Sequence, residues 1–143
     1  MNRAVLSFLL LGLISFAAIP TAHADSKREE TARANWESLK KSIDEHDANG
    51  SQAFVGQTVL IVGGLDTYKP PLRLSAQMED GNWFQIQIVP PKRNSRADRD
   101  VSRILKWKAA LVSAELMGIV RSVDVTKKVI ILEVISGYVE AST

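Results

Sequence analysis

The sequence predicts a mainly β fold: a small closed barrel of five strands, with one helix between the third and fourth strands and another helix in front. Three observations predict it. From about residue 57 apolar side chains recur with a period of two, and many are β-branched, which is typical of strands. Residues 96–108 have a helical period instead. Five short strands cannot bury both faces of a flat sheet, whereas a barrel fills its interior with one face and removes its edges.

Residues 1–24 have the three regions of a signal peptide. Arg3 supplies a positive charge, residues 4–19 are mostly apolar, and Ala22 and Ala24 give the small-x-small pattern of a cleavage site. The apolar run is shorter than the roughly 20 residues that span a bilayer, which argues against a retained membrane anchor. We therefore expect cleavage after Ala24 and a periplasmic or secreted protein with no transmembrane anchor left.

Residues 25–49 are predicted to form an N-terminal helix. The segment from Ser26 to His46 lacks Pro and Gly, and Asn-Gly at residues 49–50 is a stop signal. Its apolar stripe is thin and consists of Trp36, Leu39 and Ile43. Such a helix is marginal alone and needs a surface to lie on. We expect it to pack against the barrel; an arm that pairs with a partner is the alternative.

Residues 50–143 are predicted to form the barrel domain. Its first three strands are expected at residues 58–65, 72–78 and 83–89. Asp-Gly between the second and third strands predicts a tight turn. The side chains expected to point inward from these two strands are Leu72, Leu74, Ala76, Met78, Phe84, Ile86 and Ile88.

A helix is predicted next, at residues 96–108, with Asn94 or Ser95 as its N-cap. We expect its apolar side to close one end of the barrel. That side contains Val101, Ile104 and Leu105. The fourth and fifth strands are expected at residues 111–123 and 128–135.

Three segments resemble strands of OB-fold domains. Residues 56–64 (GQTVLIVGG) resemble the first strand, residues 111–120 (LVSAELMGIV) the fourth with its Gly-x-Val step, and residues 129–133 (VIILE) the fifth. From residue 50 to residue 138 the chain is similar to exported bacterial OB-fold proteins of the tRNA-anti-like kind. Members of that group often carry a lipid-attachment cysteine, which this chain lacks, so membrane tethering does not carry over.

The composition leaves little catalytic chemistry. The chain of 143 residues has no cysteine and two histidines, which excludes disulfides, thiolate nucleophiles and cysteine-ligated metals. His46 lies beside Asp44, Glu45 and Asp47 and could hold a divalent cation loosely, but adjacent acids on a helix do not converge on one point. No glycine-rich phosphate loop is present. We therefore expect no enzymatic activity, no metal site and no cofactor.

The outward side of the second and third strands is the first candidate site. OB-folds bind oligonucleotides and oligosaccharides there, and Trp83 can stack on a base or a sugar ring. The candidate ligand-binding residues are Tyr68, Arg73, Ser75, Gln77, Trp83, Gln85 and Gln87. The alternative is the ordinary solvated face of a sheet, where polar residues are expected in any case.

The second candidate is a basic surface. Residues 92–108 carry seven basic and two acidic side chains on a chain of net charge +2. The candidate anionic-partner surface consists of Arg96, Arg99, Arg103 and Lys106. It could meet the phosphates of a nucleic acid or the headgroups of lipids. The alternative is a charged helix face that only contacts water.

A third feature indicates protein contacts. The outward side of the fourth and fifth strands is expected to show Met117, Ile119, Val129, Ile131 and Ile135, which is too apolar to leave in water. Either the N-terminal helix covers this set or another subunit does, so a dimer is left open. The favoured function is an exported, non-enzymatic binding module for a polysaccharide, an oligonucleotide or an envelope protein. The alternative is a structural accessory subunit of a cell-envelope assembly.

Overall fold

The computed structural model describes residues 26–65, 71–106 and 112–141. The chain divides into two compact units, Met1–Thr31 and Ala32–Thr143. Of the first unit, residues 26–31 are helical; the second unit contains the strands. In the described ranges no helix is both long and apolar enough to cross a membrane. The signal-peptide prediction falls outside the described residues.

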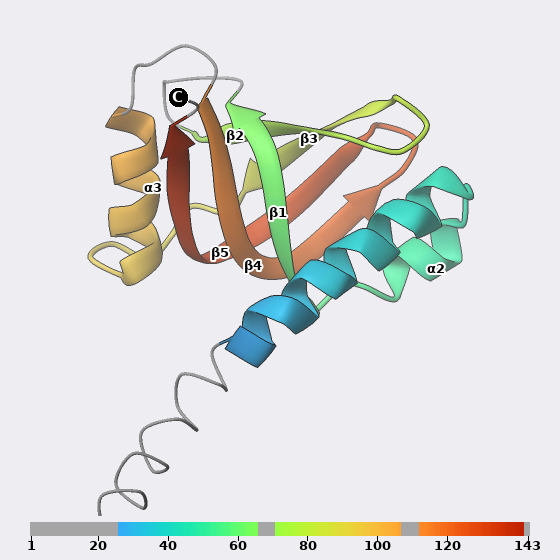
Figure 1. Cartoon of the computed structure of the whole chain (residues 1–143), viewed down its shortest axis with the longest axis horizontal. Helices are drawn as coiled ribbons and strands as arrows, with labels where there is room; N and C mark the ends of the chain where they lie inside the picture. Colours follow the sequence, from blue (N-terminus) through green and yellow to red (C-terminus); the bar gives the residue numbers. More distant parts are fainter. Residues whose placement is uncertain (1–25, 66–70, 107–111, 142–143) are drawn as a thin grey trace, which may run out of the picture. The chain divides into compact units, whose positions relative to one another are not determined.

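Five strands close into a barrel in the order β1-β2-β3-β5-β4 (Figure 1). The elements of this unit are β1 (Thr58–Leu65), β2 (Arg73–Gln77), β3 (Trp83–Ile88), α3 (Arg96–Lys106), β4 (Val112–Asp124) and β5 (Val129–Ala141). Neighbouring strands are antiparallel, except that β3 and β5 are parallel. This is the topology of an OB-fold, and it confirms the predicted fold class.

The strand boundaries agree with the sequence pattern except at β5. The first strand begins and ends at the predicted residues. The fifth strand was predicted to end at Ile135, but it continues to Ala141 because it stays paired with β4 as far as Val112. The register shifts between Met117 and Gly118, so that Ile135 has no direct partner. This irregularity breaks the period of two, and the prediction therefore stopped too early.

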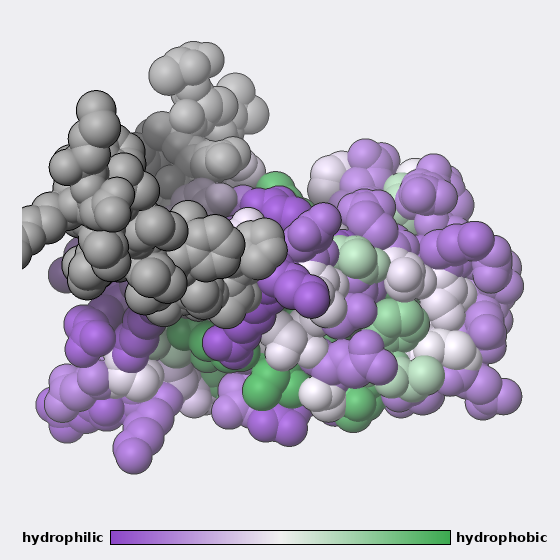
Figure 2. Space-filling view, turned by 60° about the horizontal axis from the view of Figure 1, so that its bottom comes forward, coloured by the Kyte–Doolittle hydropathy of each residue, from purple (hydrophilic) through white to green (hydrophobic). Residues whose placement is uncertain are grey.

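The interior of the barrel is apolar, as the alternation predicts. All seven side chains expected to point inward from β2 and β3 are buried. Leu116 and Val120 of β4 and Ile130 and Leu132 of β5 are fully buried beside them. On the side of the molecule drawn in Figure 2, hydrophilic side chains predominate and hydrophobic ones lie in small groups between them.

A helix over residues 26–44, called the N-terminal helix below, precedes the barrel. Its apolar stripe, Trp36, Leu39 and Ile43, is buried in the same core as the strands. Asn35 donates a hydrogen bond to the carbonyl of Thr58, at the start of β1, at 2.9 Å. Asp44 accepts the N–H of Glu79, in the β2–β3 turn, at 3.1 Å. Residues 32–44 of this helix therefore lie across the end of the barrel where β1 begins, and the expected packing of the apolar stripe is confirmed.

A short helix, α2 (Ala48–Gln52), was missed by the sequence analysis. Asn-Gly was interpreted as a stop, but both residues lie inside α2. The carboxylate of Asp47 accepts the N–H of Gly50 at 2.8 Å and caps the new helix. The side-chain amide of Gln52 donates to the carbonyl of Val123 at 2.7 Å, which ties α2 to β4. An N-cap and a tertiary contact outweigh the local stop signal.

A buried carboxylate joins the N-terminal helix to the barrel wall. Glu115 points outward from β4 yet is only 6% exposed. Its Oε1 lies 2.6 Å from Nη2 of Arg33, and its Oε2 accepts the hydroxyl of Tyr138 on β5 at 2.5 Å. A buried charge is tolerated when it is paired and hydrogen-bonded in this way.

The apolar stripe of the N-terminal helix does not cover the outward apolar set of β4 and β5, although this was one of the two explanations offered for that set. The N-terminal helix places its apolar stripe in the barrel core. The five outward side chains remain half-buried; they are Met117, Ile119, Val129, Ile131 and Ile135. The apolar stripe of the helix packs on the open end of the barrel core. The period of two along the strands could not indicate this contact.

The third helix, α3, closes the other end of the barrel, as predicted. Val101 and Ile104 are buried in the core, and Leu105 packs partly buried against it. A Cβ atom added at Gly137 of β5 would lie 3.3 Å from Cδ1 of Ile104 and 2.5 Å from Cδ2 of Leu116. The helix therefore packs closely on β5 at a residue without a side chain. Figure 1 shows α3 beside β5, at the end of the barrel away from α2.

Substitution of Gly118 by alanine is expected to lower the free energy of unfolding by about 1–3 kcal/mol. An added Cβ would lie 2.5 Å from the backbone carbonyl oxygen of Glu133. The matched control is Gly64→Ala, because nothing lies within 4 Å of a Cβ there. Urea denaturation measures both. Equal effects of the two substitutions would contradict the close approach of β4 and β5.

Leu39→Ala is expected to lower the free energy of unfolding by about 2–5 kcal/mol, since this fully buried side chain belongs to the barrel core. The neighbouring Ser38→Ala is exposed and is expected to change it by less than about 0.5 kcal/mol. Thermal and urea unfolding check this pair. A cost for Leu39→Ala no larger than that of the control would mean that the helix is a loose arm.

Candidate ligand-binding face

The β2–β3 hairpin brings six of the seven predicted ligand-binding residues onto one outer face. Its cross-strand pairs are Arg73 with Gln87, Ser75 with Gln85, and Gln77 with Trp83. These three rows of side chains are called the β2–β3 face below. The seventh residue, Tyr68, lies outside the described residues.

A tight turn sets the register of this hairpin. Gly81 has φ +88°, a left-handed conformation that glycine adopts without strain. The N–H of Met78 donates to the carbonyl of Asn82 at 2.8 Å and closes the turn. The Asp-Gly pair predicted this turn correctly. Since a shift by one residue would exchange the two faces of the strands, the turn determines which side chains point outward.

Trp83 is the most exposed large hydrophobic side chain among the described residues, with 57% of its surface accessible. It begins β3 and lies opposite Gln77, whose side-chain amide donates to the carbonyl of Gly81 at 3.3 Å. An exposed indole ring beside amide groups can stack on a planar or flat-faced ligand while the amides bind its polar edge.

Two glutamines lie in neighbouring rows of the face, Gln85 in the middle row and Gln87 in the row of Arg73. Nε2 of Gln87 donates to Oε1 of Gln85 at 2.8 Å, so each amide holds the other in place. The pair still has the amide N–H groups of Gln85 and the carbonyl oxygen of Gln87 for a ligand. Both side chains are half-buried, which limits their freedom before a ligand arrives.

The face continues onto β5. The parallel register places Val129 beside Gln85 and Ile131 beside Gln87. Both are half-buried, so they add apolar surface next to the amides. From the sequence pattern, both were expected in a separate protein-contact set. Alternation along one strand shows which side a residue faces but not which distant strand lies next to it.

Lys128 is a further residue of this region that the sequence analysis missed. Its Nζ donates to Oδ1 of Asn82 at 3.1 Å, and its backbone carbonyl accepts the N–H of Gln85 at 2.9 Å. The β4–β5 turn therefore lies against the β2–β3 turn, as Figure 1 also shows. Nothing in the spacing of the sequence indicates this contact, because 46 residues separate the two side chains.

The charge of the β2–β3 face is small. Arg73 is its only ionisable residue, and the acids nearby lie in the turn. Hydrogen bonds from the backbone N–H and the side-chain amide of Asn82, reinforced by the charge of His46, lower the pKa of Asp80 below its ordinary value. Asp80 is therefore ionised at neutral pH, and its carboxylate is occupied in the turn.

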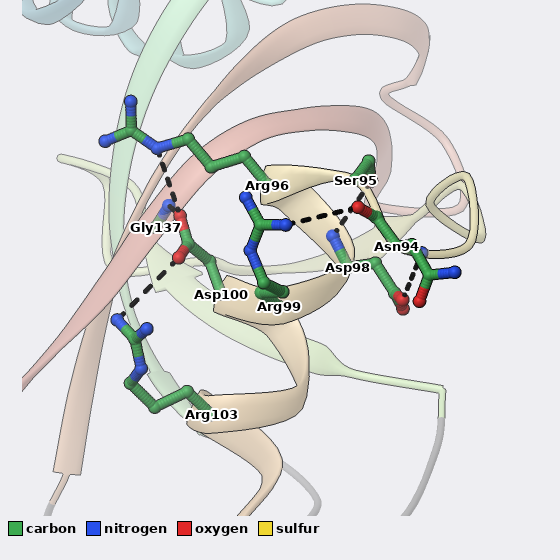
Figure 3. Close-up of polar contacts among 8 residues, drawn as sticks. All are labelled: Asn94, Ser95, Arg96, Asp98, Arg99, Asp100, Arg103 and Gly137. Carbon is green, nitrogen blue, oxygen red and sulfur yellow. Dashed lines mark hydrogen bonds and ion pairs between the residues drawn. The ribbon is translucent and has the colours of Figure 1, made fainter.

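The predicted basic surface of α3 is partly neutralised by a buried acid (Figure 3). Asp100 is only 8% exposed, and Oδ2 accepts the backbone N–H of Gly137 at 3.1 Å. Arg96 and Arg103 reach the same carboxylate, at 3.8 and 3.7 Å. Both arginines belong to the predicted anionic-partner surface. They have this internal partner, and their side chains remain 75% and 72% exposed.

The start of α3 accounts for other charges of this segment. Ser95 Oγ accepts the N–H of Asp98 at 3.1 Å, and Asp98 accepts the N–H of Asn94 at 2.9 Å. The hydrogen bond from the N–H of Asp98 to Ser95 Oγ confirms Ser95 as the N-cap. Arg99 donates to the carbonyl of Asn94 at 3.2 Å. Lys106 is exposed in the last turn, where its positive charge interacts favourably with the helix dipole.

His46 has a structural role at the end of the N-terminal helix. Its φ is +56°, and its N–H donates to the carbonyl of Ile43, while the N–H of Asp47 donates to that of Ser42. This is the hydrogen-bond pattern of a Schellman motif. Within the described ranges, no group of three His, Asp or Glu side chains is placed to hold a metal ion.

A cleft of about 430 Å³ lies between α3 and the ends of β2 and β3. Its lining is mainly apolar and includes Leu72, Ile88, Val101 and Leu105. The polar residues in the lining are Asp98 and Ser102, and Asp98 already serves as a helix cap. Ser102 is the other polar side chain that lines the cleft, beside this engaged carboxylate.

Asp100→Ala is expected to lower the free energy of unfolding by about 1–3 kcal/mol, because the N–H of Gly137 loses its buried partner. Asp100→Asn keeps an acceptor oxygen and is expected to cost less, since the two exposed arginines contribute little through their ion pairs. Urea denaturation of both variants measures the difference. If Asn cost as much as Ala, the ion pairs would be the main contribution.

No protein-family model matches the sequence, and no curated protein matches it. Among solved structures, the chain is similar to a protein from Leishmania major Friedlin assigned as an aspartyl-tRNA synthetase. The TM-score is 0.44 and the sequence identity is 15% over 68% of this chain. The chain corresponds to 19% of the length of that protein.

Proposed function

We propose that this protein is an exported, non-enzymatic binding module that holds an extended polar polymer on the β2–β3 face. The observation that carries the proposal is the placement of the exposed Trp83 in line with the paired amides of Gln85 and Gln87. Stacking gives affinity, and the amides give polar contacts along the chain of the ligand.

The shape of the face favours a polymer over a small molecule. Arg73 and Gln77 lie at opposite ends of β2, roughly 13 Å apart at the usual rise of a strand. The face is an outer wall of the barrel, so a ligand lies along it and is not enclosed. A linear ligand can contact the three rows of side chains one after another, whereas a small molecule would contact a single row.

The rigidity of the wall supports the same function. Every second residue of β2 and β3 is anchored in the sealed core, and the turn between them is held by Asp44 from the N-terminal helix. A wall that is ordered before binding loses little conformational freedom when a ligand arrives. The three rows of the β2–β3 face therefore need little rearrangement.

Export is part of the proposal and rests on the pattern of residues 1–24. The non-enzymatic character rests on the structural roles of the acids and of His46 described above. The resemblance of residues 56–64, 111–120 and 129–133 to strands of exported OB-fold proteins is consistent with export.

A second function, an accessory subunit that contacts another envelope protein, is favoured by one observation. Val62, Glu115 and Tyr138 form a row across β1, β4 and β5. Val62 and Tyr138 are 46% and 47% exposed, so this row offers apolar surface outside the three rows of the β2–β3 face. The two functions therefore use different side chains, and variants can separate them.

Trp83→Ala is expected to weaken polymer binding by roughly ten- to a hundredfold, the usual contribution of one stacked ring. The probes are a cello-oligosaccharide, an oligogalacturonate and an oligothymidylate, each titrated by calorimetry against the chain from residue 25 onward. Val62→Ala is the matched control, because it removes exposed apolar surface from β1, outside the three rows of the β2–β3 face.

The expected result is binding of at least one probe, with a loss in Trp83→Ala and no change in Val62→Ala. Binding that both variants leave intact would place the site elsewhere. The absence of binding to all three probes, together with a co-purifying protein lost in Val62→Ala, would favour the accessory subunit.

A further inference from the structure

Lys128 has an unusual backbone conformation. Its φ is +57°, in the left-handed region, where a long side chain is disfavoured and glycine or asparagine is preferred. Two other described residues besides glycine share this feature, His46 and Asn94. His46 occupies a helix C-terminus that requires it, and asparagine tolerates the conformation. Lys128 closes the β4–β5 turn, where a glycine would fit without strain.

The contacts of Lys128 lie on both sides of Trp83. Its ammonium group donates to the side chain of Asn82, directly before the tryptophan, at 3.1 Å. Its carbonyl accepts the N–H of Gln85, two residues after the tryptophan, at 2.9 Å. Any residue at position 128 could accept this backbone hydrogen bond. The ammonium contact needs a long cationic side chain in this strained conformation.

Asn82 is held from the opposite side as well. Its backbone N–H and its side-chain amide donate to the carboxylate of Asp80 at 2.9 and 2.7 Å. The oxygen of the same amide is the acceptor for Lys128, so Asp80 and Lys128 together fix which way the amide points. Asp44 binds the N–H of Glu79 in the same turn. Lys128 completes a set of contacts that immobilises the residue before Trp83.

The surroundings argue against Lys128 as a charge for an anionic ligand. The carboxylates of Glu79 and Asp80 lie in the turn that Lys128 contacts, and Asp124 lies in its own turn, where it accepts the N–H of Lys127. These acids outnumber the two lysines. The net charge of this corner is therefore not positive, and the directed contact with Asn82 is the feature that distinguishes Lys128.

We propose that Lys128 is a positioning residue that holds the β2–β3 turn so that Trp83 is presented to the ligand. This inference rests on the proposed function of the β2–β3 face. It explains why a lysine occupies a left-handed conformation that glycine would adopt without strain. The lysine destabilises the turn locally and orders the aromatic ring.

The test uses Lys128→Gly, which relieves the strain, and Lys128→Asn, which tolerates the conformation; both remove the ammonium group. Lys127→Asn removes a neighbouring charge from the same turn and is the control. The heteronuclear NOE of the Trp83 indole N–H, assigned with Trp83→Phe, reports the mobility of the ring without any ligand. Affinity for the three polymer probes is measured in parallel, and urea denaturation reports stability.

We expect Lys128→Gly to raise the urea midpoint while lowering the indole NOE and weakening binding roughly two- to tenfold, the contribution of one hydrogen bond. Lys128→Asn is expected to show the same NOE and affinity changes, and Lys127→Asn neither. Combining Lys128→Asn with Asn82→Ala is expected to add no further loss beyond that of Asn82→Ala alone, since both remove one contact.

An unchanged indole NOE in both Lys128 variants would overturn the proposal. A loss of affinity from Lys128→Asn that persists undiminished in the Asn82→Ala background would also overturn it, because it would show direct contact between the lysine and the ligand. If the wild-type chain binds none of the probes, the proposed function fails, and the NOE still decides the role of Lys128.

Discussion

A small barrel of five strands is open at both ends, and its apolar interior must be closed by something other than strands. Here the N-terminal helix closes one end with Trp36, Leu39 and Ile43, and α3 closes the other with Val101 and Ile104. All five side chains belong to the same core as the inward residues of the barrel. The strands alone would leave that core in contact with water, so the two helices and the barrel are one unit of stability.

This closure determines what the polar side chains can do. Glu115 fixes the N-terminal helix to β4, Asp44 fixes it to the β2–β3 turn, and Asp100 fixes α3 to β5. These three carboxylates are therefore occupied in holding the helices to the barrel. The outer wall of β2 and β3 presents Trp83 and a row of amides instead, and recognition by a rigid surface follows as the proposed function.

The period of two predicted the inward and outward sides of β2 and β3, and the helical period predicted α3 with its cap. These features are local, since they depend on neighbouring residues along the chain. The prediction failed where a distant contact decides the structure. The irregularity at Ile135 interrupts the period of two, so the second half of β5 was not predicted. The hydrogen bonds of Asp47 and Gln52 stabilise α2 although Asn-Gly predicts the end of a helix there.

The candidate site divides in the same way. Six residues of the β2–β3 face could be predicted because alternation and a turn place them there. Lys128, Val129 and Ile131 could not, because they approach the face through the parallel pairing of β3 with β5. The internal partner of Arg96 and Arg103 was also hidden. The sequence contains Asp100 beside these arginines, but its burial against Gly137 depends on the packing of α3 on β5 and could not be predicted.

Native-state hydrogen exchange tests the central claim most directly. If the N-terminal helix is part of the barrel core, the amides of Leu39 and Ile43 open with the same free energy as those of Ile61 and Leu132, and all four follow global unfolding in low denaturant. Exchange of the helix amides through a much smaller opening free energy, while the barrel amides stay protected, would show that the barrel is closed without the helix and would contradict the account.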